Sequence, residues 1–124
     1  MLHKTGYIKL DTLIREIPHD IRKTLEYARK SKDDMDYIVF HQANNFINSY
    51  IAKKMKLDSE KIPSTIAKYG NTSSVSVPLT IVSELRDKLD GNKTLLLSAF
   101  GVGMCWATGI VPFVDCKISE IVEV

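Results

Sequence analysis

Short apolar runs alternate along this chain with longer segments whose apolar residues recur every three or four positions. The runs are rich in strand formers, and the longer segments each carry the single apolar stripe of an amphipathic helix. The predicted strands are 37–40, 94–100 and 105–113. The predicted helices are 10–29, 45–56 and 75–89. This alternation favours an α/β fold in which helices cover a sheet.

Several local details of these elements are also predicted. Pro18 falls inside the first helix, so it either kinks that helix or starts a second one. Asn44 is a good N-cap for the helix that follows it. Segments 64–66 and 114–124 are candidates for two further strands, the second because Ile118, Ile121 and Val122 suggest alternation.

The helix at 45–56 is expected to bury one face and to end in water. The residues expected to face inward are Ile47, Tyr50, Ile51 and Met55. The lysines at its end, Lys53, Lys54 and Lys56, are expected to be solvated and to suit the helix dipole. For the helix at 75–89, any of Ser73, Ser74 and Ser76 can serve as the N-cap.

Composition restricts the class of protein. A chain of 124 residues is expected to form one domain, residues 1–124. Its net charge of +2 and lack of a dense basic stretch do not predict nucleic-acid binding. No apolar run has the ~20 residues of a membrane span, and the first residues lack a signal-peptide core. With only two cysteines, a cytoplasmic location is expected.

Two polar clusters lie where apolar runs meet helices. The first, His41-Gln42-Ala43-Asn44, follows a predicted strand, and the second, Tyr69-Gly70-Asn71-Thr72-Ser73, precedes a helix. An imidazole and a carboxamide are neutral hydrogen-bond donors of the kind that stabilises an enolate oxygen. Taken alone, His41 fits a structural histidine equally well, and Asn71 fits turn chemistry better.

Other chemistry has weaker support in the sequence. His3, His19 and His41 share no metal-ligand spacing, so no metal site is expected. Cys105 is flanked by Met104 and Trp106 in an apolar run and is expected to be a small core residue rather than a nucleophile. Gly101 and Gly103 do not form a dinucleotide fingerprint and instead predict a turn that approaches a ligand closely.

Three motifs taken together resemble the C-terminal half of 3-oxoacyl-acyl-carrier-protein synthase III, a condensing enzyme of the thiolase-fold superfamily. The motifs are His41-Gln42-Ala43-Asn44, Tyr69-Gly70-Asn71-Thr72-Ser73 and Ala99-Phe100-Gly101-Val102-Gly103-Met104-Cys105-Trp106. The resemblance covers about residues 5–113, which leaves 114–124 as a C-terminal extension. It implies a thiolase-like half, a mixed sheet with helices on both faces.

The resemblance also implies a reaction. Such an enzyme, which acts in fatty acid biosynthesis, moves an acyl group from acyl-CoA onto a cysteine, then decarboxylates malonyl-carrier protein and joins the two. It uses no cofactor and commonly forms a homodimer. His41 matches the catalytic histidine and Asn71 the catalytic asparagine, while the backbone N–H of Val102 would lie near the acyl oxyanion. The cysteine belongs to an N-terminal half that these residues do not include, so the chain alone is expected to be inactive.

Departures from the family keep alternatives open. Phe46 stands where the family often has an arginine that is associated with carrier-protein contact, Cys105 where threonine is common, and Ala107 where glycine is common. One alternative is therefore a CoA-dependent condensing enzyme that uses no carrier protein. Another is a non-catalytic, thiolase-like partner subunit or remnant that binds without turnover.

Overall fold

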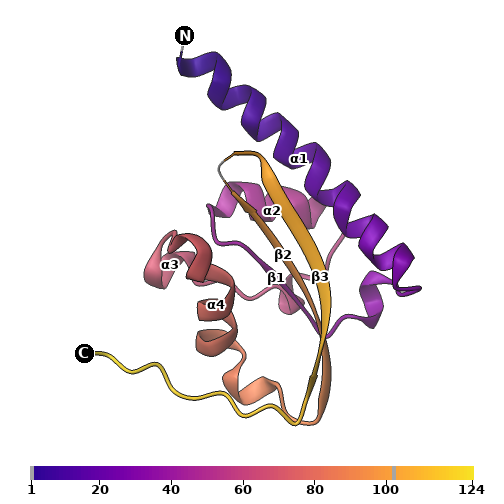
Figure 1. Cartoon of the computed structure of the whole chain (residues 1–124), viewed down its shortest axis with the longest axis vertical. Coiled ribbons are helices and arrows are strands. Elements are labelled where there is room, and N and C mark those ends of the chain that lie inside the picture. Colours follow the sequence, from indigo (N-terminus) through magenta and orange to yellow (C-terminus); the bar gives the residue numbers. More distant parts are fainter. Residues whose placement is uncertain (1, 102) are drawn as a thin grey trace.

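The chain folds into three layers, in which a three-stranded sheet separates two sets of helices (Figure 1). The computed structural model describes residues 2–101 and 103–124, with side chains from Leu10 onward. The strands are β1 (Tyr37–Phe40), β2 (Asn92–Gly101) and β3 (Cys105–Val114). Their order is β1-β2-β3, with β1 parallel to β2 and β2 antiparallel to β3. The predicted mixed sheet is confirmed.

Four α-helices and four short 3-10 turns connect and cover these strands in the described part of the chain. The α-helices are α1 (Leu2–Tyr27), α2 (Asn45–Lys54), α3 (Ile66–Tyr69) and α4 (Ser76–Glu84). The 3-10 turns are η1 (Lys32–Asp34), η2 (Ser59–Lys61), η3 (Ser73–Val75) and η4 (Arg86–Lys88). Asn44 is the N-cap of α2, where its side chain accepts a hydrogen bond from the backbone N–H of Ile47 at 2.9 Å.

The sheet has a separate apolar core on each face. Because successive side chains of a strand point to opposite faces, Ile38 and Phe40 of β1 lie in the core formed with α1 and α2. Val39 lies between them and joins the core formed with α4, which contains Ile81 and Leu85. The prediction that helices cover both faces is therefore confirmed, and this double burial explains why β1 is apolar throughout.

Helix α1 continues through Pro18 without a break. Proline has no N–H, so the carbonyl of Ile14, four residues earlier, has no helical donor. The ammonium of Lys54 at the end of α2 donates to that carbonyl at 3.2 Å. One of the lysines expected to be solvated, Lys54, thus connects α1 and α2.

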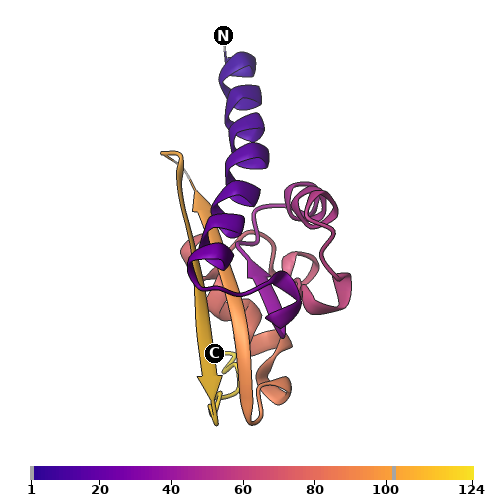
Figure 2. The same ribbon diagram turned by 90° about the vertical axis from the view of Figure 1, so that its right-hand side faces the viewer.

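Figure 2 shows the N-terminal part of α1 projecting beyond the sheet. In the described part of the chain, no helix combines the length and apolarity needed to cross a membrane.

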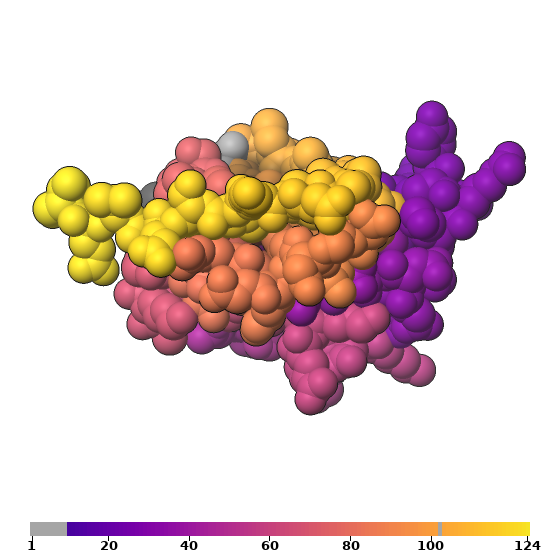
Figure 3. All heavy atoms as spheres, turned by 90° about the horizontal axis from the view of Figure 1, so that it is seen from below, coloured from indigo at the N-terminus to yellow at the C-terminus, as the bar shows by residue number. Residues whose placement is uncertain are grey.

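Three predictions about the elements are wrong. Residues 64–66 are not a strand, because Thr65 lies at the N-cap position of α3. Tyr50 of α2 does not face inward but is 42% exposed and lies beside the ring of Phe46. Residues 114–124 add no strand. Beyond Val114 they run across the surface over the α4–β2 region, where Arg86 donates to the carbonyl of Ile118 (Figure 3).

Candidate active site

His41 and Asn71 line one open cavity of about 1030 Å³ at the end of the sheet. His41 directly follows β1, and Asn71 lies between α3 and η3. The lining of this cavity also includes apolar side chains of the strands, Leu97 and Phe100 of β2 and Trp106 of β3. The structure therefore brings together the two donors that the sequence placed thirty residues apart.

The imidazole of His41 is held from two sides. Its Nδ1 lies 2.6 Å from the hydroxyl oxygen of Ser76, at the start of α4. Phe100 meets the imidazole edge-on, with ring centroids 5.3 Å apart and planes at 87°. Burial of the ring lowers the pKa of His41 from its ordinary value of 6.5, because the charged form loses hydration. The imidazole is therefore neutral near pH 7.

The carboxamide of Asn71 has one end occupied and one end free. Its Oδ1 accepts a hydrogen bond from the backbone N–H of Ser73 at 2.9 Å, while its Nδ2 has no hydrogen-bond partner among the described residues. The preceding Gly70 has φ 66°, a left-handed conformation that suits glycine and turns the chain into the cavity wall. The carboxamide oxygen of Asn71 thus stabilises the local turn, while its Nδ2 is left to donate a hydrogen bond.

Of the other two predicted site residues, one lies outside the described residues and the other lies on the surface of α2. Val102 lies outside the described residues, so the expected oxyanion contact of its backbone N–H stays a prediction. Phe46 lies on the first turn of α2 and is 62% exposed. It is not among the residues that line the cavity of His41, and its role as a carrier-protein docking position stays a prediction.

Two residues of the cavity wall differ from the sequence expectation. Cys105 is exposed and lines the same cavity as His41, so the prediction of a core cysteine is wrong. It fails because Cys105 is the first residue of β3, at the end of the strand that borders the cavity. Ser76 is fully buried against His41 and does not cap α4, whose N-cap is Val75. No pattern in the sequence distinguished Ser76 from its neighbouring serines.

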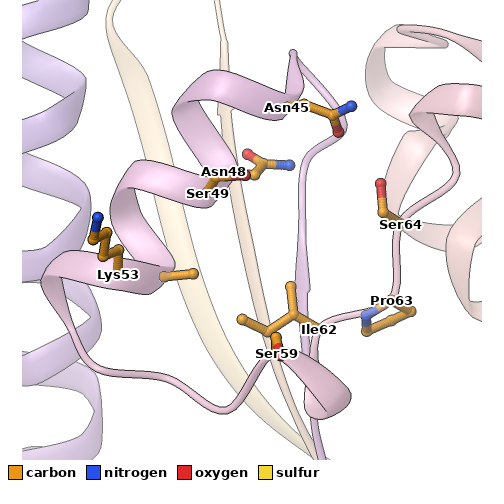
Figure 4. Close-up of a pocket in the computed structure, with 9 residues that line it drawn as sticks. Asn45, Asn48, Ser49, Lys53, Ser59, Ile62, Pro63 and Ser64 are labelled. Carbon is orange, nitrogen blue, oxygen red and sulfur yellow. The ribbon is translucent and has the colours of Figure 1, made fainter.

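A second, smaller hollow of about 330 Å³ lies behind His41, between α2 and the segment that leads to α3. Figure 4 shows the side chains of Asn48 and Ser64 reaching into this space from its opposite walls. Asn48 donates from Nδ2 to the carbonyl oxygen of His41 at 3.1 Å, while its buried Oδ1 has no hydrogen-bond partner among the described residues. This hollow therefore shares a wall with the backbone that carries His41.

Comparison with known proteins identifies the family. The family described as 3-oxoacyl-[acyl-carrier-protein (ACP)] synthase III C terminal matches residues 25–113. The chain belongs to this family. The resemblance inferred from the three motifs is confirmed.

Relatives agree with this assignment in sequence and in fold. A beta-ketoacyl-[acyl-carrier-protein] synthase III of Streptococcus sanguinis is 40% identical over 109 residues, which is 86% of this chain and 34% of the relative. The crystal structure of a 3-oxoacyl-(acyl-carrier protein) synthase from Burkholderia xenovorans matches with a TM-score of 0.88 at 36% identity, over 93% of this chain and 33% of that one.

A more distant structure gives the same fold. The synthase III of Thermus thermophilus matches with a TM-score of 0.82 at 26% identity, over 90% of this chain and 35% of that one. The chain thus spans about a third of the length of the relatives it matches. The thiolase-like α/β fold class is confirmed, while the activity of a whole enzyme is a matter for proposal.

Proposed function

We propose that this chain is the C-terminal part of a synthase III-type acyltransferase, in which His41 and Asn71 stabilise the enolate formed from a malonyl thioester. The supporting observation is that a neutral imidazole and an unpartnered carboxamide N–H, from separate elements, line one cavity. Each group is a neutral hydrogen-bond donor, and we take both to act on the same thioester oxygen.

The chemistry follows from those two donors. When a malonyl thioester loses CO₂, the bond between its carboxylate and α-carbon breaks, and the electron pair is shared with the thioester oxygen as an enolate. Preorganised donors aimed at that oxygen stabilise the charge without transferring a full proton, and each is typically worth ~10²–10³ in rate. The enolate carbon then attacks the acyl thioester on a cysteine, whose sulfur leaves as thiolate.

That cysteine is expected in the N-terminal part of the parent enzyme. Cys105, at the start of β3, lines the same cavity as the donors. The chain on its own is accordingly proposed to be inactive. Its partners in the working enzyme would be the segment that carries the cysteine, an acyl carrier protein and a second copy of the full protein.

A chimera tests the proposal. The third of the Streptococcus sanguinis relative that aligns with this chain would be replaced by this chain, and condensation of acetyl-CoA with malonyl-carrier protein would be measured. We expect activity that falls ~10²–10³-fold in His41→Ala, whereas His19→Ala, an exposed histidine of α1, leaves it unchanged. A folded chimera without condensing activity would favour the non-catalytic, thiolase-like alternative.

The exposed Phe46 favours a second candidate substrate, malonyl-CoA in place of malonyl-carrier protein. An aromatic ring that is 62% exposed, at the position where the family often has arginine, cannot form an ion pair with an acidic carrier protein. The same chimera would be assayed with malonyl-CoA and with malonyl-carrier protein. A preference for malonyl-CoA that Phe46→Arg reverses would assign a carrier-independent condensing activity instead.

A further inference from the structure

Ser76 is the only side chain whose hydroxyl touches His41 among the described residues. It is 0% exposed, and its oxygen lies 2.6 Å from Nδ1 of the imidazole. The same oxygen accepts a hydrogen bond from the backbone N–H of Gln42 at 3.2 Å. The hydroxyl of Ser76 thus contacts both the imidazole of His41 and the backbone N–H of the next residue, Gln42.

The position of one proton follows from these contacts. A serine hydroxyl has one hydrogen to donate, and the only acceptor within its reach in the described structure is Nδ1 of His41. If Nδ1 carried its own proton, the buried serine hydrogen would have no acceptor, which is unfavourable. The arrangement therefore selects the tautomer with a bare Nδ1 and the proton on Nε2, the nitrogen free to face the cavity.

Ser76 is itself fixed by a closed circuit of buried polar groups. Its carbonyl accepts from the hydroxyl of Thr80 at 2.8 Å. Because the Thr80 hydrogen is used there, the hydroxyl of Thr65 donates to Thr80, also at 2.8 Å. The backbone N–H of Thr65 donates to Oε1 of Gln42 at 2.9 Å. The backbone N–H of Gln42 donates to the hydroxyl of Ser76, which closes the circuit.

This circuit joins the supports of both donors. Its four members, Gln42, Thr65, Ser76 and Thr80, are each at most 1% exposed. Asn71 lies in the segment between Thr65 and Ser76, so both ends of its loop are tied to the residue that follows His41. Buried polar networks whose groups are all paired impose one arrangement, because each group left unpaired carries a desolvation cost.

We propose that Ser76 is a positioning residue that holds His41 as the Nε2–H tautomer, and that the Gln42–Thr65–Thr80–Ser76 circuit sets the relative placement of His41 and Asn71. The consequence for catalysis rests on the proposed function, whereas the tautomer itself does not. With its proton on Nε2, the imidazole presents a donor to the cavity rather than a base.

Nitrogen-15 NMR of the histidine rings in the full chain tests the tautomer directly. His41 would be assigned by comparison with His41→Gln, which leaves His3 and His19. In the unmodified chain above the pKa of His41, we expect a shift typical of a bare nitrogen at Nδ1 and of a protonated one at Nε2. A proton on Nδ1 would overturn the proposal without any variant having to fold.

Two substitutions of Ser76 test whether its hydroxyl sets the tautomer of His41. In Ser76→Ala the loss of the hydroxyl is expected to give a mixture of tautomers and to raise the pKa of His41, because the bond that favours the neutral form is gone. Ser76→Thr retains a hydroxyl and should keep the Nε2–H form. Ser83→Ala, on the same helix and with its hydroxyl bonded to Glu84, should change neither the tautomer nor the pKa of His41. An unaltered tautomer and pKa in Ser76→Ala would contradict the proposal.

The chimera separates this proposal from the proposed function. There, Ser76→Ala is expected to lower kcat for malonyl decarboxylation about 10-fold with little change in KM, less than the ~10²–10³-fold cost of losing a donor outright. If Ser76→Ala shifts the tautomer but His41→Ala leaves decarboxylation unchanged, the positioning role stands and the proposed function fails.

Discussion

At the scale of single residues, the site depends on keeping His41 neutral and Asn71 half free. Burial of the imidazole disfavours its charged form, and the hydroxyl of Ser76 meets its Nδ1. In Asn71 the carboxamide oxygen accepts the N–H of Ser73, which leaves the carboxamide nitrogen to donate. Both side chains are thereby arranged to donate hydrogen bonds rather than to accept protons or bind cations.

The lowered pKa of His41 predicts a pH dependence of stability. In the unfolded chain the histidine takes up a proton as the pH falls through about 6.5, whereas in the folded chain it stays neutral until the pH reaches the lowered pKa. Stability that is present above 6.5 should therefore be lost as the pH falls below it. Denaturant unfolding at pH 7.5 and 5.5 should show a larger loss for the unmodified chain than for His41→Gln.

The comparison with His41→Gln isolates this group, because all other titrating residues are common to both proteins. Equal losses in the two chains would show that the pKa of His41 is the same in the folded and unfolded states. The sign matters as well. A smaller loss in the unmodified chain would mean that the folded protein favours imidazolium, which would remove the basis for a neutral donor.

At the scale of elements, the sequence predicted what depends on local periodicity and missed what depends on neighbours. Strand β1 and helix α2 follow from their apolar patterns and from the Asn44 cap. Tyr50 was misplaced because the apolar stripe of α2 is narrower than its pattern suggested. The pairing of Ser76 with His41 joins residues 35 apart in the chain, and no local pattern encodes it.

The joint between α1 and α2 gives a prediction at this scale. Lys54 supplies the donor that Pro18 removes from the carbonyl of Ile14. Lys54→Met should therefore lower the free energy of unfolding by about 0.5–1 kcal/mol, since the bond is exposed to water. Lys53→Met removes an equivalent charge from the same helix end and should fall within about 0.5 kcal/mol of the unmodified chain.

Urea unfolding of the two variants measures this difference. The effect of the helix dipole is shared by the two neighbouring lysines, so it cancels in the comparison. If Lys53→Met costs as much as Lys54→Met, the stabilisation would come from charge at the end of α2 and not from the bond to Ile14. Pro18→Ala, which restores the helical donor, should make Lys54→Met nearly neutral.

At the scale of the whole molecule, the chain leaves surfaces that a larger protein would be expected to cover. The cavity of His41 and Asn71 is open and includes apolar groups such as Trp106. β3 is one of the two edge strands of the described sheet, and β1 is the other. The carbonyl of Thr94 on β2 accepts from the backbone N–H of Asp36, so the backbone of Thr94 bonds away from β3. Its partner on β3 is Pro112, whose backbone nitrogen therefore points to the outer edge of the sheet. Because proline has no N–H, this edge has one donor fewer.

These surfaces predict self-association of the isolated chain. Open apolar area and a free strand edge both promote contacts between copies. Sedimentation velocity over a range of concentrations should show a sedimentation coefficient that increases with concentration. Trp106→Ser and Trp106→Leu offer a matched pair, because the serine variant should weaken association more than the leucine variant. A monomer at every concentration would contradict the expectation.

The central claim is that His41 and Asn71 stabilise the enolate of a malonyl thioester and take no part in loading the acyl group. The most direct test measures both half-reactions in one chimera, with Asn71→Ala beside Asn92→Ala, an exposed asparagine at the start of β2. We predict that Asn71→Ala lowers decarboxylation ~10²–10³-fold while acyl transfer from acetyl-CoA persists, and that Asn92→Ala changes neither. Equal losses in both half-reactions, or unchanged decarboxylation, would contradict the account.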